Sequence, residues 1–311
     1  MRMLVIGAGA IGGYYGARLA HAGRDVTFLV RARRAAQLEK YGLVIKSPRG
    51  DYAITPKLVA ATTIDGPYDV VLVAIKAFSL EAVLGDMAQA IGPGTMILAP
   101  LNGMKHVEVL SARFGARSIM GCVCKIAVEL DTEGRIIQLN PQEDMAYGEM
   151  DGGPSTRARA LNIFMQDAGF PARLSPVIAR EMWEKWILLA GLGGINCLMR
   201  GTIGEVENAP GGVTFANALL DEIIAVVTAV GIPPTEEFVG FARKMLTAKG
   251  SPITSSMYRD LTKGAPIEAD QIIGDLLARG TQAAITTPLL ETVYTHLAVY
   301  ENARAHSTMA I

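Results

Sequence analysis

The stretch from Met3 to Gly13 constrains the fold more than any other part of this chain, and it is read as M-L-V-I-G-A-G-A-I-G-G. Its apolar run, Leu4 to Ile6, is typical of a strand buried in a parallel sheet. The residues that follow, Tyr14 to Ala22, predict a helix. A glycine-rich turn thus joins a buried strand to a helix, which indicates an α/β fold.

The three glycines of this turn have the spacing G-x-G-x-x-G. Gly7 permits the tight turn, Gly9 lets the backbone approach a pyrophosphate, and Gly12 lets the helix pack closely on the strand. Ala10 and Ile11 lie within the motif, just before the predicted helix, and are further candidate cofactor residues. Free N–H groups and the positive end of the dipole at a helix N-terminus favour phosphate. We therefore predict a dinucleotide site here. The alternative is a glycine-rich turn in some other α/β protein.

Composition and charge limit what the folded chain does. Of its 311 residues, 50% are hydrophobic and 19% are charged, which suffices for a sizeable core in one or two domains. The net charge of −1 provides no basic surface for nucleic acid or an anionic membrane. The first apolar run is too short for a signal peptide. We expect a soluble, cytoplasmic protein that binds neither nucleic acid nor membrane.

The cysteines and histidines predict no metal site. Cys122 and Cys124 have the spacing of one strand face, and with Cys197 they make an odd number of thiols. We expect them to be reduced and buried in a core. The 4 histidines are scattered along the chain, whereas a metal site needs several ligands close together.

Residue 31 follows the predicted strand Asp25–Val30, where this kind of fold selects its cofactor. NAD sites place an acidic side chain there to bind the ribose 2′-hydroxyl. This chain has Arg31 instead, and a guanidinium group binds a 2′-phosphate that an acidic side chain would repel. We therefore predict NADP(H) as cofactor, with Arg31 as a ligand. We interpret Arg33 and Arg34 as solvated residues at a helix start.

Two polar residues follow later strands of the predicted sheet. Lys76 comes directly after the buried strand Val70–Ile75, and Asn102 follows the strand Thr95–Ala99. Open α/β sheets bind ligands outside the carboxyl ends of their strands, so both are candidate cofactor or substrate residues. The alternatives are a solvated loop for Lys76 and a turn residue before glycine for Asn102.

The remaining pattern predicts two domains. Strands alternate with helices in residues 1–174, where we expect a Rossmann-like domain that binds NADP. Long helical segments separated by Gly and Pro dominate residues 175–311, where we expect an all-helical domain for substrate binding and dimerisation.

Further elements expected in the first domain are a hairpin over Leu43–Ser47 and Asp51–Thr55, a helix over Leu80–Ile91, strands over Ile119–Val128, Arg135–Leu139 and Met145–Gly148, and a helix from Ser155 to Ala168. The helices expected in the second are Val177–Met199, Val213–Val230, Glu236–Ala248, Ala269–Arg279 and Pro288–Ala303.

Charged and polar residues of the helical part have two interpretations. The helix after Lys185 is apolar on nearly every face, so the lysine must reach water, a carboxylate or a ligand. The alternatives to a ligand are an i,i+4 pair with Glu181 and a side chain extended into solvent. Local rules alone make Ser255 or Ser256 a helix N-cap and place Glu268 in a first helical turn.

Taken together, these motifs resemble the ketopantoate reductase (2-dehydropantoate 2-reductase) family in identity and order over nearly the whole chain. The motifs that carry the resemblance are the N-terminal G-x-G-x-x-G, Lys76, Leu101-Asn102-Gly103, Trp183-Glu184-Lys185, Ser255-Ser256-Met257-Tyr258-Arg259-Asp260 and Glu268. The resemblance implies a Rossmann domain followed by an all-helical domain, with substrate bound between them. It also implies NADPH-dependent reduction of a 2-oxo acid to a 2-hydroxy acid.

The resemblance assigns a role to each matching residue. Lys185 is similar to the general acid that protonates the carbonyl oxygen, and Glu268 to the acidic partner that orients the lysine or a substrate hydroxyl. Ser256 resembles the contact to the substrate carboxylate. Asn102 resembles the residue that bridges nicotinamide and substrate, and Lys76 the lysine on the cofactor side.

One departure from the family bears on the substrate. The family commonly places asparagines one and two turns after the lysine, where this chain has Leu189 and Gly193. A hydroxyl-bearing substrate would lose a hydrogen-bond partner there, and such a loss changes discrimination by orders of magnitude. Three hypotheses follow: ketopantoate reduction in pantothenate synthesis, reduction of another branched or aromatic 2-oxo acid, and a non-catalytic NADP(H) sensor. A sensor would need neither Lys185 nor Glu268.

Overall fold

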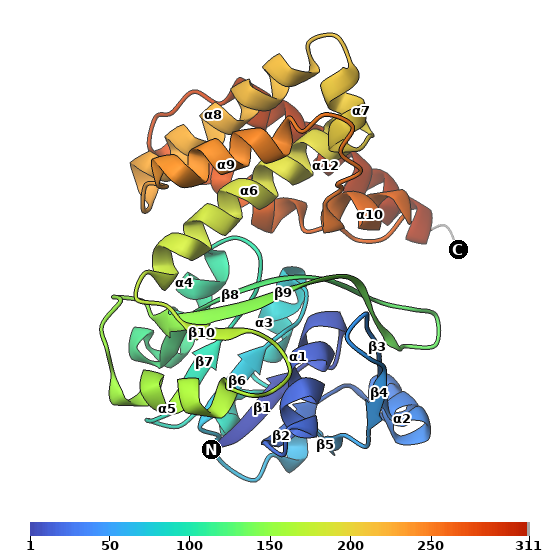
Figure 1. Ribbon diagram of the computed structural model, residues 1–311, viewed down its shortest axis with the longest axis vertical. Coiled ribbons are helices and arrows are strands. Elements are labelled where there is room, and N and C mark those ends of the chain that lie inside the picture. The colour runs from blue at the N-terminus through green and yellow to red at the C-terminus, as the bar shows by residue number, and fades with distance from the viewer. Residues whose placement is uncertain (310–311) are drawn as a thin grey trace. The chain divides into compact units, whose positions relative to one another are not determined.

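The computed structural model describes residues 1–309 and confirms the predicted α/β class, a mostly parallel sheet domain followed by a helical region (Figure 1). Contacts group the chain into two compact units. Unit 1 comprises Met1–Leu101 and His106–Ala179, and unit 2 comprises Asn102–Lys105 and the chain from Arg180 onward. The short segment Asn102–Lys105 is therefore an excursion into unit 2. The domain limits 1–174 and 175–311 stay a prediction.

Unit 1 is built on a 10-stranded sheet with the order β4-β3-β9-β8-β7-β6-β1-β2-β5, and β10 pairs with β9. Strands β8, β7, β6, β1, β2 and β5 are parallel to one another, and the β3–β9 and β10–β9 pairs are also parallel. The β8–β9 and β3–β4 pairs are antiparallel. The strands are β1 Arg2–Ile6, β2 Asp25–Leu29, β3 Leu43–Lys46, β4 Tyr52–Ile54, β5 Lys57–Val59, β6 Val70–Val73, β7 Met96–Leu98, β8 Ile119–Leu130, β9 Ile136–Glu149 and β10 Ala172–Leu174. The helices are α1 Ala10–His21, α2 Ala32–Tyr41, α3 Leu80–Val83, α4 Lys105–Phe114 and α5 Thr156–Met165.

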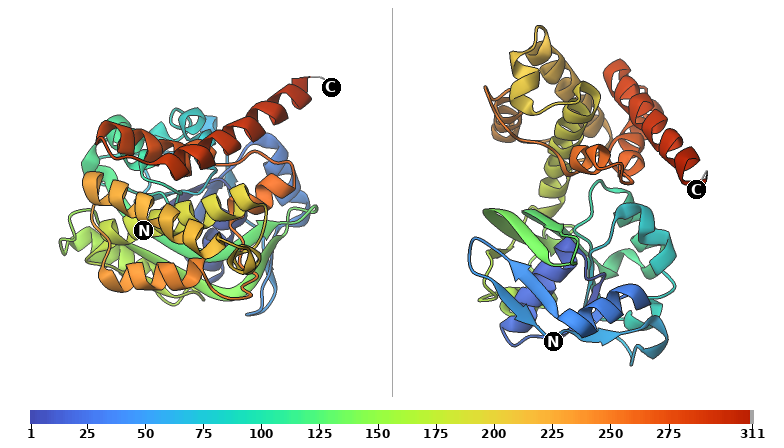
Figure 2. Two further views of the ribbon diagram at one scale, coloured as in Figure 1. Left: turned by 90° about the horizontal axis from the view of Figure 1, so that it is seen from above. Right: turned by 90° about the vertical axis from the view of Figure 1, so that its right-hand side faces the viewer.

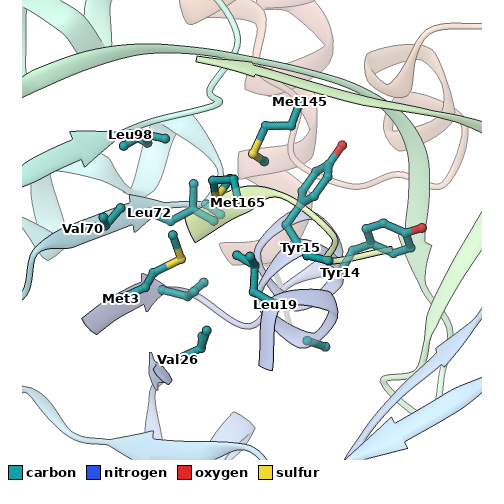
Figure 3. Close-up of a cluster of buried hydrophobic side chains, with 14 of the residues drawn as sticks. Met3, Tyr14, Tyr15, Leu19, Val26, Val70, Leu72, Leu98, Met145 and Met165 are labelled. Atoms are coloured by element: carbon teal, nitrogen blue, oxygen red, sulfur yellow. The ribbon is translucent and has the colours of Figure 1, made fainter. Parts of the chain in front are cut away.

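Both faces of the sheet are buried, because alternate residues of each central strand enter different cores. Met3 and Val5 of β1 belong to the core that contains α1 and α5 side chains, part of which Figure 3 shows. Leu4 and Ile6 belong to the core that contains α3 and α4 side chains. This double covering explains why β1 reads as a continuous apolar run. Cys122 and Cys124 are buried in the first core, Cys197 is also buried, and none of the three forms a disulfide, as predicted.

Two predicted elements of unit 1 are wrong. The helix expected over Leu80–Ile91 ends at Val83, just before Gly85, a residue that weakens helices. The strands expected over Arg135–Leu139 and Met145–Gly148 form a single strand, β9, because β8 offers a continuous antiparallel partner on both sides of a bulge opposite Ala127. Pro141 lies within that bulge, where its missing N–H removes no ladder hydrogen bond.

Unit 2 contains helices and, among its described residues, no strand (Figure 2). Its helices are α6 Ile178–Met199, α7 Ile203–Asn208, α8 Gly212–Val230, α9 Glu236–Leu246, α10 Ser256–Thr262, α11 Asp275–Gln282 and α12 Pro288–Met309; α6 begins in unit 1. The predicted helix Ala269–Arg279 is wrong in one respect. It opens with a π-helical turn, Asp270–Gly274 (η5), before α11 begins.

By length and composition, α8 is the single described helix that is apolar enough to cross a membrane, with a mean hydropathy of 1.8. A core helix of a soluble protein meets the same criterion. The buried residues of α8, which include Ala216, Leu219, Ile223 and Val226, recur at the spacing of one helix face. That stripe is what a helix packed on neighbouring helices requires.

Candidate active site

The glycine-rich turn follows the carboxyl end of β1, and its three glycines differ in the space around them. Gly7 has φ +91°, and a Cβ there would lie 2.8 Å from Ile75 Cγ2. A Cβ at Gly12 would lie 2.2 Å from the Gly7 carbonyl oxygen and 2.8 Å from the Ala74 Cβ. A Cβ at Gly9, in contrast, would meet no atom within 4 Å. Gly7 and Gly12 are thus fixed by the fold, whereas the space at Gly9 is open.

Gly9 is the N-cap of α1, and, as a glycine, it has no side chain to cap the helix. The amides of Ala10 and Ile11 follow in the first turn of the helix, where backbone N–H groups have no intrahelical acceptor. Within the sheet, β1 lies between β2, the next strand of the chain, and β6, which comes later in the chain. The turn therefore lies at the point where the strand order reverses, which is where doubly wound sheets bind nucleotides. These residues fit a pyrophosphate in both space and charge.

Arg34 supports this turn, so its interpretation as a solvated residue is wrong. Its Nε donates to the Ala8 carbonyl oxygen at 3.0 Å, and its Nη1 donates to the Gly134 carbonyl oxygen at 3.0 Å. The guanidinium is half-buried, and burial lowers the pKa of Arg34. The cluster of basic residues Arg31, Arg33 and Arg34 is the only sequence signal for this role. Arg33 is exposed, in agreement with its interpretation.

Arg31 and Lys76 follow the carboxyl ends of β2 and β6, the two strands that flank β1. Because the three strands are parallel, these residues emerge at the same edge of the sheet as the glycine-rich turn. Both side chains are exposed. Arg31 occupies the N-cap position of α2 with extended backbone. The cofactor roles of Arg31 and Lys76 stay predictions.

Asn102 and Glu268 lie together in unit 2, although they are far apart in the sequence. Asn102 Nδ2 donates to Glu268 Oε2 at 3.2 Å. Glu268 is 6% exposed, and it lies directly before the helical segment rather than in its first turn, since its carbonyl accepts from the Ile272 N–H at 3.0 Å. Asn102 is therefore more than a turn residue, because it contacts the carboxylate to which the family resemblance assigns a catalytic role.

Lys185 lies in α6 and is partly buried. Within the described residues, its ammonium group has no hydrogen bond or ion pair, and the alternative of a pair with Glu181 is therefore not found. The adjacent Trp186 donates its indole N–H to the Ile272 carbonyl oxygen at 2.8 Å. This bond links the helix of Lys185 to the segment that carries Glu268. The sequence contained no signal for it.

Ser256 is the first residue of α10, and its neighbour Ser255 is the N-cap, accepting from the Tyr258 N–H at 3.0 Å. The Ser255 N–H donates to Asn196 Oδ1 of α6 at 2.8 Å. On the other side of Ser256, Met257 packs against α6, since a Cβ at Gly193 would lie 2.6 Å from the Met257 methyl group. Ser256 is thus held between two residues that contact the helix of Lys185. Its own contact to substrate stays a prediction.

Comparison with known proteins identifies a family that this chain is similar to over most of its length. The family model described as "Ketopantoate reductase PanE/ApbA" matches residues 3–152, and the model "Ketopantoate reductase PanE/ApbA C terminal" matches residues 177–301. The chain is 35% identical over 301 residues to "Uncharacterized oxidoreductase YkpB" of Bacillus subtilis (strain 168), which covers 97% of this chain and 99% of the relative.

Two solved structures are also similar. The 2-dehydropantoate 2-reductase from Geobacter metallireducens GS-15 has a TM-score of 0.86 at 28% identity, and the match covers 96% of this chain and 99% of that one. A D-mandelate dehydrogenase in ternary complex with NADH and anilino(oxo)acetate has a TM-score of 0.87 at 20% identity, covering 98% of this chain and 100% of that one. The second similarity concerns the fold alone.

Proposed function

Because the chain belongs to the ketopantoate reductase family of oxidoreductases, we propose that it reduces a 2-oxo acid to the 2-hydroxy acid with NADPH. The observation that carries the proposal is the contact between Asn102 and Glu268 in the unit that also holds Lys185. These are the residues that the family resemblance assigns to substrate and proton transfer. The glycine-rich turn supports the nucleotide part of the proposal, since its open space at Gly9 suits a pyrophosphate.

The proposed chemistry needs one cation and one carboxylate from this chain. When bound, the reduced nicotinamide supplies the hydride that adds to C2 of the substrate. Lys185 stabilises the negative charge that develops on the carbonyl oxygen and gives that oxygen its proton, which completes the hydroxyl group. Glu268 orients the lysine or a substrate hydroxyl, Asn102 holds Glu268 and the substrate, and Ser256 binds the substrate carboxylate. Lys185 then recovers a proton from solvent.

The choice between NADPH and NADH depends on Arg31. We expect Arg31→Ala to lower kcat/KM for NADPH by roughly 10-fold or more and to change kcat/KM for NADH little, because only NADPH carries the 2′-phosphate. Steady-state kinetics with both nucleotides measure the ratio. Arg33→Ala is the matched control, since Arg33 is exposed on the same helix, and it should leave the ratio unchanged. An unchanged ratio in Arg31→Ala would exclude Arg31 as the phosphate ligand.

Two substrates are candidates, and the chain has a feature that favours each. The family assignment favours ketopantoate, which would place the enzyme in pantothenate synthesis. The surface of α6 beyond Lys185 favours a more apolar 2-oxo acid with a branched or aromatic side chain. Leu189 lies one turn beyond the lysine, and the space beside Gly193 is filled by Met257. Neither position offers the hydrogen bond that a hydroxyl-bearing substrate would use.

A panel of 2-oxo acids separates the candidates. NADPH oxidation should be measured at 340 nm with ketopantoate, 2-oxoisovalerate, 2-oxo-4-methylpentanoate and phenylpyruvate. A kcat/KM highest for ketopantoate supports the pantothenate role, and a value at least ~10-fold higher for an apolar acid supports the second candidate. No turnover of any acid, with NADPH still bound, would favour a sensor and contradict the proposal. The proposal also includes a homodimer and a cytoplasmic location, for which light scattering and cell fractionation are the measurements.

A further inference from the structure

We propose that Trp186 is a positioning residue of the reaction, which holds the helix of Lys185 in register with the segment that carries Glu268. This inference rests on the proposed function, because it assigns to Lys185 and Glu268 the roles given above. Trp186 is 1% exposed, and we assign it no contact to the reacting atoms or the substrate. It acts through the peptide backbone on its two sides, and every contact that carries the inference lies within unit 2.

The indole of Trp186 is a buried and specific tie between two segments. The side chain is 1% exposed, and its N–H donates to the Ile272 carbonyl oxygen at 2.8 Å. The Ile272 N–H in turn donates to the Glu268 carbonyl oxygen at 3.0 Å. Two hydrogen bonds thus connect the residue next to Lys185 with the backbone of Glu268. A buried indole N–H without a partner would be unfavourable, so the tie has one preferred geometry.

The backbone that receives this hydrogen bond is unusual. Ile272 lies in the π-helical turn Asp270–Gly274, which the Asp275 N–H closes by donating to the Asp270 carbonyl oxygen, five residues back rather than four. A π turn inserted before an α-helix shifts the register of carbonyl acceptors, and a carbonyl at such a junction is available to a side-chain donor. Single π turns occur frequently at functional sites. Here the turn joins Glu268 to α11 and presents its carbonyl to Trp186.

The segment that carries Asn102 closes the same set of contacts. Asn102 Nδ2 donates to the Glu268 carboxylate. At the next residue, a Cβ on Gly103 would lie 2.3 Å from the Gln271 carbonyl oxygen and 3.8 Å from Trp186 Cε2, and Gly103 has φ +78°. Three segments distant in sequence therefore meet at the π turn. Asn102 fixes the side chain of Glu268, and Trp186 fixes its backbone relative to α6.

The consequence concerns the lysine. Its four-carbon side chain is flexible, and the ammonium group has no partner among the described residues that would orient it. The backbone from which it extends is therefore the part that the fold controls. Misplacement of a catalytic group by about 1 Å costs on the order of 10²-fold in rate. The Trp186 bond is one residue away from that backbone position.

The test compares two indoles in one aromatic stack. Trp183 and Trp186 have ring centroids 5.4 Å apart, and Arg279 lies over both, at 6.0 Å and 5.7 Å. Within the described residues, only Trp186 of the two donates a hydrogen bond. Trp186→Phe and Trp183→Phe therefore remove similar ring area, but only the first removes the donor. A second form of the protein carries at position 186 a benzothiophene analogue of tryptophan, which keeps the shape and lacks the N–H.

We expect Trp186→Phe and the benzothiophene form to lower kcat by ~10-fold or more, with an unchanged KM for NADPH and a larger isotope effect with 4-deuterated NADPH. We expect Trp183→Phe to have a kcat within about 2-fold of wild type and an unchanged isotope effect, because this substitution removes no hydrogen-bond donor to Ile272. A wild-type kcat in the benzothiophene form would overturn the inference. So would an equal loss of kcat in both phenylalanine variants.

Hydrogen exchange provides a readout that does not depend on turnover. Backbone amides of residues 268–275 should exchange at least ~10-fold faster in the benzothiophene form and in Trp186→Phe than in wild type or Trp183→Phe. Unchanged exchange in that segment would overturn the inference even if the wild-type protein reduced none of the 2-oxo acids. Absence of wild-type turnover, in contrast, bears on the proposed function. The two failures are therefore distinguishable.

Discussion

Replacing Lys185 with alanine is expected to lower kcat by at least about 10²-fold, because the variant lacks the group that donates a proton to the developing alkoxide. Folding should be intact. The lysine has no ion pair or hydrogen bond among the described residues to lose, and alanine is the best helix former for a position in α6. Steady-state kcat with the best acid of the panel, together with a thermal unfolding curve, measures both effects.

The matched control for this variant is Lys244→Ala. Lys244 is exposed on α9 in the same unit, and its loss removes the same charge without touching α6. We expect kcat of this control within about 2-fold of wild type. A near-normal kcat in Lys185→Ala would remove the lysine from the proposed mechanism.

Alanine substitutions at two glycines of the same turn should affect different properties, NADPH binding for Gly9 and stability for Gly12. Gly9→Ala should leave stability unchanged, since its Cβ would meet no atom within 4 Å and its backbone is extended. It should weaken NADPH binding by about 10-fold or more, because the Cβ occupies the space through which backbone approaches a pyrophosphate. Gly12→Ala should destabilise unit 1 by roughly 1–3 kcal/mol or more, because its Cβ would lie 2.2 Å from the Gly7 carbonyl oxygen.

Thermal unfolding without nucleotide and fluorescence titration with NADPH separate these effects. Gly85→Ala is the control, since a Cβ there also meets no atom within 4 Å and the residue is outside the turn. It should change neither quantity. If Gly9→Ala bound NADPH with wild-type affinity, the nucleotide would not approach the chain at this turn.

Local signals in the sequence were enough for the elements that local chemistry controls. The turn at Gly7 needs φ +91°, which glycine adopts readily, and the strand before it is apolar because both of its faces are buried. The N-cap at Ser255 follows in the same way from a hydroxyl placed before a helix. The prediction of β9 as two strands failed because pairing with β8 outweighed the local turn signal around Pro141.

Sequence reasoning found the candidate site residues singly, and the tertiary structure decided which of them are neighbours. From the sequence, Asn102 is either a turn residue or a ligand of cofactor or substrate. In the fold, its amide donates to the Glu268 carboxylate. The sequence alone places Arg34 in solvent, yet its guanidinium donates to the Ala8 carbonyl oxygen. The hydrogen bond of Trp186 depends on a π turn 86 residues away, and no pattern along the chain specifies that register.

By itself, the sequence determined the α/β class, the steric roles of the glycines in the turn, and the residue types available for hydride-transfer chemistry. These follow from backbone conformation and apolar periodicity, which act over a few residues. Only the tertiary structure decided that Asn102, Trp186 and Glu268 belong to one connected set of contacts. Such contacts join segments distant in sequence, and their geometry depends on how whole helices pack rather than on any local preference.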